Sequence, residues 1–473
     1  MGASFAVGRA TAESSSVRRT DRDGRMSGES VFEGELGTLD CVLLSLGGMV
    51  GSAIFVFPGS TGRLTGPSAV GAWLVAGVLM LAIALCYTEL ALAFPETGAV
   101  AVFPYETLGP SPAIRAFASY LEGVCYTVGW VFGISVSALA IADYLAILVP
   151  AAGGHVPLVA LVAIGAATLV NLLGVDVTSR ANLLLSALLL AVLCAFVASG
   201  FARFRPSNYE PFFAAGPVRF FAAVQVALTA YGAWTAIPSV VEEIETPSRT
   251  VPRAILVSLA AATLLYTAIV AAVHGVVPIE RFAADSAAIT APLGVAAGAI
   301  GLPWLRSLLA FGAVIAIFTT LLVGVMSAGR VLFALGRNDT LPRAFAATSG
   351  FRVPWVGVLA VGVVAGALVT VPGYFSQLLV VAAVVGTGVP YALNILSFVG
   401  LRHYRTDIES PFRAPGGDAL AIVAFAGIAV AMIGLGSTEI RWSLGALAVL
   451  IGSFVLRAAL VPDAIEPETP TDS

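Results

Sequence analysis

The sequence predicts an all-α membrane protein with about twelve transmembrane helices, of which the first and the sixth are discontinuous. Of its 473 residues, 58% are hydrophobic and only 11% are charged, and the mean hydropathy is +0.96. The surface of a soluble domain is about a quarter charged, so most of this protein's surface must face lipid. This composition leaves no room for a large soluble domain.

Twelve apolar segments are each long enough to cross a hydrocarbon core of ~30 Å, which takes ~20 helical residues. The segments from 113 and from 303 exceed that length, which predicts tilted helices or helices that extend beyond the bilayer. In chain order the segments are 39–62, 67–94, 113–149, 156–174, 180–201, 218–241, 254–278, 303–335, 355–372, 376–400, 419–436 and 442–461.

Two of these segments are interrupted by residues that suit a helix poorly. The first contains Gly47–Phe55, with three glycines and a serine at its centre, and the sixth contains Tyr231–Thr235. Glycine lowers helix stability, and backbone groups freed at membrane depth are tolerated only where they are buried in protein or line a wet cavity. Interrupted helices at corresponding positions of two halves are typical of solute carriers and mark their binding site.

Arginine supplies all 24 basic residues, and its distribution predicts the orientation. With the N-terminus inside, 17 arginines fall on the cytoplasmic side and 7 on the outside, as the positive-inside rule requires. We therefore expect a multi-pass protein of the cell membrane with both termini in the cytoplasm. Residues 1–35 are polar and lack the apolar core of a signal peptide. They are expected to form a disordered cytoplasmic tail, with Met26 as an alternative start, and residues 462–473 an acidic one.

Several stretches, in this order over nearly the whole chain, resemble the amino acid–polyamine–organocation permeases. They are Leu36–Asp40 with Gly51–Phe55 and Gly66-Pro67, Tyr87–Leu90 with Phe94–Gly98, Asn171–Val175, Glu242–Ala254, Arg330–Pro342, Leu401–Tyr404 and Ser410–Pro415. The resemblance implies a leucine-transporter-type core of two inverted five-helix repeats, at 36–203 and 213–403, and two peripheral helices within 418–461. The two interruptions then open the two repeats, as their positions alone suggest.

Three positions depart from that family's pattern. Ala53 stands where the family has a third glycine, and Thr235 stands where an acidic residue often follows the second interruption. Leu189 aligns near a lysine that some proton-dependent members carry, and this chain contains no lysine. The resemblance therefore implies transport without assigning the coupling ion.

The interruptions suggest a binding site for an α-amino acid. Freed N–H groups at a half-helix N-terminus bind anions, and the candidates are the backbones of Gly51, Ser52 and Ala53 with the Ser52 hydroxyl. Freed carbonyls attract an ammonium group, and the candidates are Met49, Thr229 and Gly232. Trp234 abuts the second interruption, and with Ala53 it favours a neutral side chain. The alternative interpretation is that the glycines serve close helix packing.

A second prediction concerns a coupling cation. Thr319 and Thr320 lie near the middle of the eighth segment, which in the leucine-transporter fold packs against the first interruption. Their hydroxyls and the carbonyls of Gly47 and Val50 would suit Na⁺. The alternatives are that each threonine bonds a carbonyl in its own helix, or that transport proceeds by exchange or by proton coupling through a carboxylate such as Glu122.

The remaining acidic residues near the membrane divide into two groups. Glu89, Glu96, Glu242 and Glu243 lie at segment ends and are expected to pair with nearby arginines. Asp143 and Glu122 lie within the third segment, where a carboxylate is a functional candidate by default.

These observations predict a secondary active transporter that takes up neutral amino acids by alternating access. The alternatives are a cationic amino acid or polyamine exchanger of the same fold and an amino acid sensor that does not transport. No HExxH motif or nucleophile–base arrangement lies at membrane depth in the sequence, so we predict no enzyme. The expected partners are an amino acid substrate and the lipid bilayer, with no nucleic acid, no cofactor except Na⁺ as a coupling ion, and a monomeric or homodimeric state.

Overall fold

The computed structural model describes residues 37–94, 99–174, 179–237, 244–338, 340–350, 353–371 and 373–460, and the elements named in these ranges are helices. The two predicted tails lie outside the described residues, as do Glu96, Glu242 and Glu243.

Each predicted apolar segment coincides with helix. The helices at these segments are α1 (Thr38–Met49), α2 (Ser52–Thr65), α3 (Ala69–Ala93), α5 (Pro112–Leu148), α6 (Val156–Leu172), α7 (Ser179–Ala202), α8 (Pro217–Thr229), α9 (Pro247–Val276), α13 (Pro303–Arg337), α14 (Trp355–Val369), α15 (Phe375–Ala383), α16 (Val389–His403), α17 (Gly417–Ile433) and α18 (Ser437–Leu460).

Shorter helices lie between these segments. The α-helices among them are α4 (Ala99–Thr107), α10 (Ile279–Ala284), α11 (Ser286–Thr290) and α12 (Pro292–Ile300). The 3₁₀ turns are η1 (Gly66–Ser68), η2 (Pro150–His155), η3 (Pro206–Tyr209), η4 (Gly232–Ala236) and η6 (Arg343–Ala346), and η7 (Val384–Gly388) is a turn of π-helix. The sequence analysis did not anticipate α10–α12 or the π-turn.

The helices present apolar side chains on the outside of the bundle. Among the described residues, seven helical segments are long and apolar enough to cross a membrane, and four shorter apolar helices accompany them. On α17 and α18, Ile422, Val449 and Leu456 are each at least 60% exposed. An outer surface of this kind is typical of helices that face lipid.

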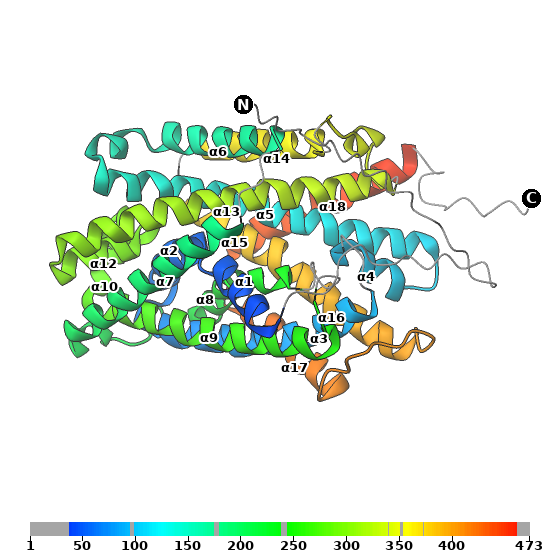
Figure 1. Cartoon of the computed structure of the whole chain (residues 1–473), viewed down its shortest axis with the longest axis horizontal. Helices are drawn as coiled ribbons and strands as arrows, with labels where there is room; N and C mark the ends of the chain where they lie inside the picture. The colour runs from blue at the N-terminus through cyan, green and yellow to red at the C-terminus, as the bar shows by residue number, and fades with distance from the viewer. Residues whose placement is uncertain are drawn as a thin grey trace, which may run out of the picture.

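The long helices lie roughly parallel, with the interrupted pair α1 and α2 between them (Figure 1). Helices α5 and α13 run side by side along the molecule, and α6 packs against α14 beside them. On the other side, α3 packs against α8 and α9, and α17 covers α3 and α8. Helix α1 lies against α9, and α2 lies against α8, so the first interruption is enclosed by other helices.

The π-turn η7 brings one span into backbone contact with α5. A Cβ placed on Gly386 would lie 2.0 Å from the Cα of Gly129 on α5, so neither position tolerates a side chain. Without side chains between them, the two backbones approach closely. Single π-turns within α-helices occur frequently at functional sites.

Candidate functional site

The first interruption separates α1 from α2 by two residues, Val50 and Gly51. The chain leaves helical geometry at Gly51, which is extended with φ −105° and ψ −153°. The Gly51 N–H donates to the Met49 carbonyl over 2.7 Å. The sequence therefore predicts this interruption correctly, to within one turn of helix.

Side chains from α5 and α13 hold the start of α2 in place. The Ser52 N–H donates to the Thr320 hydroxyl on α13 over 3.0 Å, and the Ser137 hydroxyl on α5 donates to that of Ser52, also over 3.0 Å. One turn later, the Tyr144 hydroxyl donates to the Phe55 carbonyl. Thr320 thus lies against the first interruption, as the resemblance implies.

The second interruption follows the end of α8 at Thr229. The chain continues through the 3₁₀ turn η4, in which the Thr235 hydroxyl donates to the Gly232 carbonyl over 2.9 Å. The Tyr231 hydroxyl donates to the Trp73 carbonyl on α3, which fixes the turn against its neighbour. The residues from 238 to 243 lie outside the described ranges.

The two interruptions lie against each other. Tyr266 on α9 is fully buried, and its hydroxyl contacts both Met49 O of the first interruption and Ala230 O of the second, the latter at 3.5 Å. A Cβ on Gly48 would lie 3.2 Å from the Cβ of Ala233 in η4. The structure therefore brings together two sequence stretches that are about 180 residues apart.

The first turn of α2 supplies N–H donors that no carbonyl within the helix accepts, as at any helix N-terminus. Ser52 uses its N–H on Thr320, which leaves those of Ala53 and Ile54. Ile54 was not among the predicted donors, although the rule for helix N-termini identifies it once the start of α2 is known. Gly51 and Ser52 thus shape the turn, and Ala53 and Ile54 provide the donors.

The predicted acceptors differ in how far they are already occupied. The Met49 carbonyl accepts from Gly51 and from Tyr266, and the Gly232 carbonyl accepts from Thr235. The Thr229 carbonyl belongs to the last residue of α8, and the buried hydroxyl of the same residue has no partner among the described residues. Because Gly232 is the first residue of η4, its carbonyl also lies within the backbone hydrogen-bonding pattern of that turn.

Trp234 is fully buried beside the second interruption. Its ring meets Tyr87 of α3 edge to face, with ring centroids 5.0 Å apart and planes at 87°, and its indole N–H has no partner among the described residues. A buried tryptophan usually finds an acceptor for this donor. Trp234 and Tyr87 together form an aromatic wall at the second interruption.

The comparison with known proteins gives the family. Residues 36–455 match the family model described as amino acid permease. The chain belongs to the amino acid permease family. Among its relatives, the branched-chain amino acid permease BcaP of Bacillus subtilis is 29% identical over 407 residues, which covers 82% of this permease and 85% of the relative. Two further relatives have other printed substrates.

The methylthioribose transporter of Bacillus subtilis is 26% identical, with 80% of this permease and 84% of the relative covered. The chloroplastic cationic amino acid transporter 9 of Arabidopsis thaliana is 29% identical, with 67% of this permease and 58% of the relative covered. These relatives are transporters, and with the apolar helices they identify the permease as a multi-pass membrane protein.

The threonines predicted to bind Na⁺ bond to carbonyls of their own helix in the permease. The Thr319 hydroxyl donates to Ala316 O over 2.9 Å, and the Thr320 hydroxyl donates to the same carbonyl over 2.9 Å. Thr320 in addition accepts from Ser52, which ties it to the first interruption. Sodium binding by these hydroxyls and by the carbonyls of Gly47 and Val50 stays a prediction.

The expected pairing of Glu89 with an arginine is confirmed. Arg402 of α16 donates to both Glu89 oxygens, over 2.9 and 2.6 Å, and Glu89 also accepts from the backbone N–H of Ala414. Glu89 is 2% exposed, and the Arg402 guanidinium stacks 4.5 Å from the centre of the Phe398 ring. This pair joins the ends of α3 and α16 and the loop that follows.

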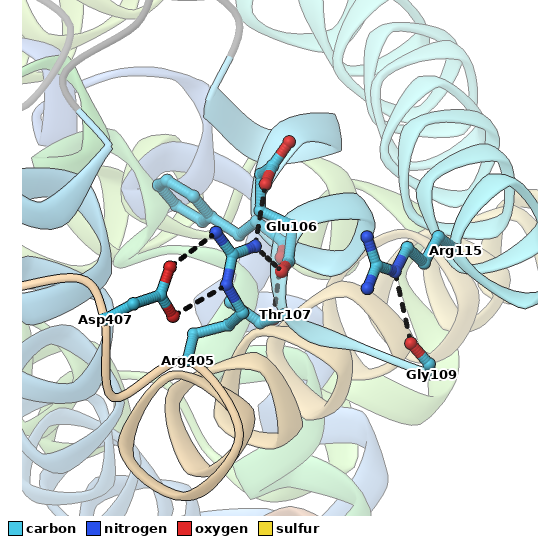
Figure 2. A network of polar contacts seen from close by, with 7 residues as sticks. Glu106, Thr107, Gly109, Arg115, Arg405 and Asp407 are labelled. Atoms are coloured by element: carbon cyan, nitrogen blue, oxygen red, sulfur yellow. Dashed lines mark hydrogen bonds and ion pairs between the residues drawn. The ribbon is translucent and has the colours of Figure 1, made fainter. Parts of the chain in front are cut away.

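A second arginine ties the same loop to α4 (Figure 2). Arg405 donates to the carbonyl and the carboxylate of Glu106, over 2.7 and 3.0 Å, and to both oxygens of Asp407. The hydrogen bond from Arg405 lowers the pKa of Asp407 below its usual value. Nearby, Arg115 donates to the Gly109 carbonyl and so fixes the turn before α5.

A polar cavity of about 400 Å³ lies beside these ion pairs and apart from the two interruptions. Charged and polar side chains line it, including Glu89 of α3, Arg402 of α16, Arg413 of the loop between α16 and α17, and Asp418 of α17. Its lining is mainly polar, with Leu401 and Ile408 as its aliphatic side chains, whereas ligand sites are usually lined mostly by apolar side chains. The interruptions are therefore the better candidate for the substrate site.

Proposed function

We propose that this permease is a secondary active transporter of the cell membrane that takes up neutral amino acids by alternating access. The observation that carries the proposal is the meeting of the two helix interruptions, which Tyr266 bridges through Met49 and Ala230. Such meeting points near the bilayer midplane are where transporters of this kind bind substrate. In this proposal two inverted five-helix repeats surround the site, and both termini lie in the cytoplasm.

The substrate's backbone would lie between α2 and η4. Its carboxylate accepts from the N–H groups of Ala53 and Ile54, where the dipole of α2 adds positive potential. Its ammonium group donates to the carbonyls of Gly232 and Thr229, at the negative end of α8. A zwitterion therefore satisfies both ends without a charged side chain.

The substrate's side chain would contact Ala53 and the aromatic wall of Trp234 and Tyr87, which favours an apolar group. Each of the two carboxylates that would suit a cationic substrate accepts a hydrogen bond from a neighbouring helix. Asp143 accepts from Thr290 of α11, and Glu122 accepts from Asn394 of α16. The name of the branched-chain amino acid permease points the same way, whereas that of the cationic amino acid transporter favours the alternative.

Competition for uptake distinguishes these substrates. Purified permease in liposomes is expected to take up labelled leucine, and excess leucine or alanine is expected to suppress this uptake while excess arginine leaves it unchanged. Suppression by arginine alone would contradict a neutral substrate. Binding of leucine without any uptake would indicate the sensor alternative.

Sodium coupling is the second part of the proposal. Thr320 contacts the first interruption through Ser52, so a cation held there would stabilise the same turn that binds the carboxylate. Leucine uptake is expected to be faster under an inward Na⁺ gradient than with choline at equal pH. The Thr320→Ala variant is expected to lose that difference, and Thr320→Ser, which keeps the hydroxyl, is expected to retain it. Equal uptake in Na⁺ and choline rules the sodium site out.

A further inference from the structure

The imidazole ring of His274 is buried without a hydrogen bond in the last turn of α9, which the proposed orientation places on the outer side of the membrane. The residue is 0% exposed, and neither Nδ1 nor Nε2 has a partner among the described residues. A neutral imidazole carries a donor on one nitrogen and an acceptor on the other, and burying both without partners costs free energy. Such a group needs an explanation beyond packing.

Two neighbouring elements enclose the ring. A Cβ on Gly62 of α2 would lie 2.8 Å from Cε1 and 3.0 Å from Nε2 of His274, so the ring packs directly on the backbone of α2. The ring of Phe282 on α10 is 1% exposed, and its centroid lies 5.0 Å from that of the imidazole with the planes at 35°. His274 therefore lies where α10 meets the second half of α2.

The short helices α10 and α11 cover this half of α2. Both pack against it. A Cβ on Gly59, one turn before Gly62, would lie 2.4 Å from the carbonyl oxygens of Ala288 and Ile289 in α11, so the two backbones are in contact. The first interruption lies at the other end of α2. A substrate that arrives from outside can reach it only when this side of the permease opens, as alternating access requires.

No charged group compensates for a charge on the buried ring. Among the described residues, none forms an ion pair or a hydrogen bond with His274. The η1 turn, α12 and the first three turns of α3 contain no titratable or charged side chain. The titratable and charged groups on the other elements around this end of α9 are Arg63 of α2, Cys194 of α7, Arg203, Arg205, Tyr209 and Glu210 around η3, Tyr266 of α9 itself, Glu280 and Arg281 of α10, and Asp285 before α11.

We propose that His274 senses the pH outside the cell, and that its protonated form holds the permease open to that side. The imidazolium ion carries two N–H donors and a positive charge, and the closed contact offers neither an acceptor nor a counter-ion. The proton therefore binds only after α10 separates from α2 and water reaches the ring. By linkage, closure expels the proton, and acid outside opposes closure. The proton comes from the outer solution and returns to it, so it is not transported.

The effect on uptake follows from the ordinary titration of histidine, and it rests on the proposed transport function. A histidine in water has a pKa of about 6.5, so in the open state the ring is mostly neutral at pH 7.5 and mostly charged at pH 5.5. Only the neutral form can close. Where closure limits the cycle, uptake falls about tenfold between these two pH values, because the neutral fraction of the open state falls by that factor.

The first test is uptake of labelled leucine in liposomes, at equal pH on both sides and with a constant Na⁺ gradient. Wild-type uptake is expected to fall about tenfold from pH 7.5 to pH 5.5. His274→Leu, which fits an apolar site, and His274→Gln, which cannot be protonated, are expected to lose this fall and to match the wild type at pH 7.5. The exposed histidines provide the controls, and His155→Gln and His403→Gln are expected to keep it. Equal pH profiles of wild type and His274→Leu overturn the inference.

The second test measures the opening itself and needs no substrate. Hydrogen–deuterium exchange of the backbone amides of α10 and α11 is compared with that of α6 in the same full-length sample, so that the intrinsic effect of pH on exchange cancels. The ratio is expected to rise in the wild type on acidification to pH 5.5 and to stay constant in His274→Leu. A constant ratio in the wild type overturns the inference even if the variants do not fold. If the wild type takes up no leucine at any pH, the transport proposal fails, and the exchange ratio still decides whether acid opens this contact.

Discussion

A permease with leucine in place of Gly51 is expected to insert into the membrane and to lose amino acid binding and uptake. A Cβ at this position would lie 2.7 Å from the Thr320 hydroxyl oxygen, closer than atoms of this kind approach. The larger side chain would displace Thr320 from the Ser52 N–H and fill the space beside the first turn of α2. Uptake of labelled leucine in proteoliposomes should fall to the level of empty liposomes.

A matched control separates this effect from a general intolerance of leucine. Gly165 of α6 lies within a long apolar helix, and no heavy atom would lie within 4 Å of a Cβ there apart from its own chain neighbours. Gly165→Leu should therefore transport like the wild-type protein. Both variants should elute as monodisperse protein in detergent. Normal uptake by Gly51→Leu would show that the first interruption does not bind substrate.

Removing Arg402 is expected to produce the largest loss of stability. Replacing it by leucine leaves the Glu89 carboxylate buried, with the Ala414 N–H but no cation to balance its charge. Breaking a buried pair in this way typically costs about 3–5 kcal/mol. The melting temperature of the purified permease should fall sharply, and the double variant Glu89→Leu/Arg402→Leu should recover part of the loss, because it leaves no unpaired charge.

The ion pair between Arg405 and the exposed residue Asp407 provides the control. Asp407 accepts from Arg405 but lies in solvent, where ion pairs contribute little. Asp407→Asn should leave the melting temperature nearly unchanged. If Arg402→Leu proves as stable as Asp407→Asn, the Glu89–Arg402 pair does not hold α3 and α16 together.

Local composition was sufficient to predict the helices and the places where they stop. The apolar segments coincide with helices because lipid requires backbone hydrogen bonds to be formed within each segment. The ends of α1 at Met49 and of α8 at Thr229 follow from the glycines near them. Glu89 was expected to find an arginine because a carboxylate so close to the membrane needs one. The family resemblance, confirmed over residues 36–455, rests on these same stretches.

The contacts that complete the site could not be predicted from the sequence. Tyr266 looks like any aromatic residue of an apolar helix, and only the packing of α9 against α1 places its hydroxyl on Met49. The π-turn at Gly386 depends on the close approach of Gly129, which is more than 250 residues away. Helices α10–α12 are too short for hydrophobic periodicity to be recognised. Ile54 became a donor candidate only when the first residue of α2 was known.

The central claim is that the two interruptions bind both charged groups of an amino acid, and equilibrium binding of labelled leucine to purified permease tests it most directly. Three competitors of equal side-chain size should be compared: leucine, its decarboxylated amine and its deaminated acid. A site built from the N–H groups of Ala53 and Ile54 and the carbonyls of Thr229 and Gly232 should release the label only to leucine, because each analogue leaves one set of buried groups unpaired. Displacement by either analogue at the concentration at which leucine acts would contradict the claim.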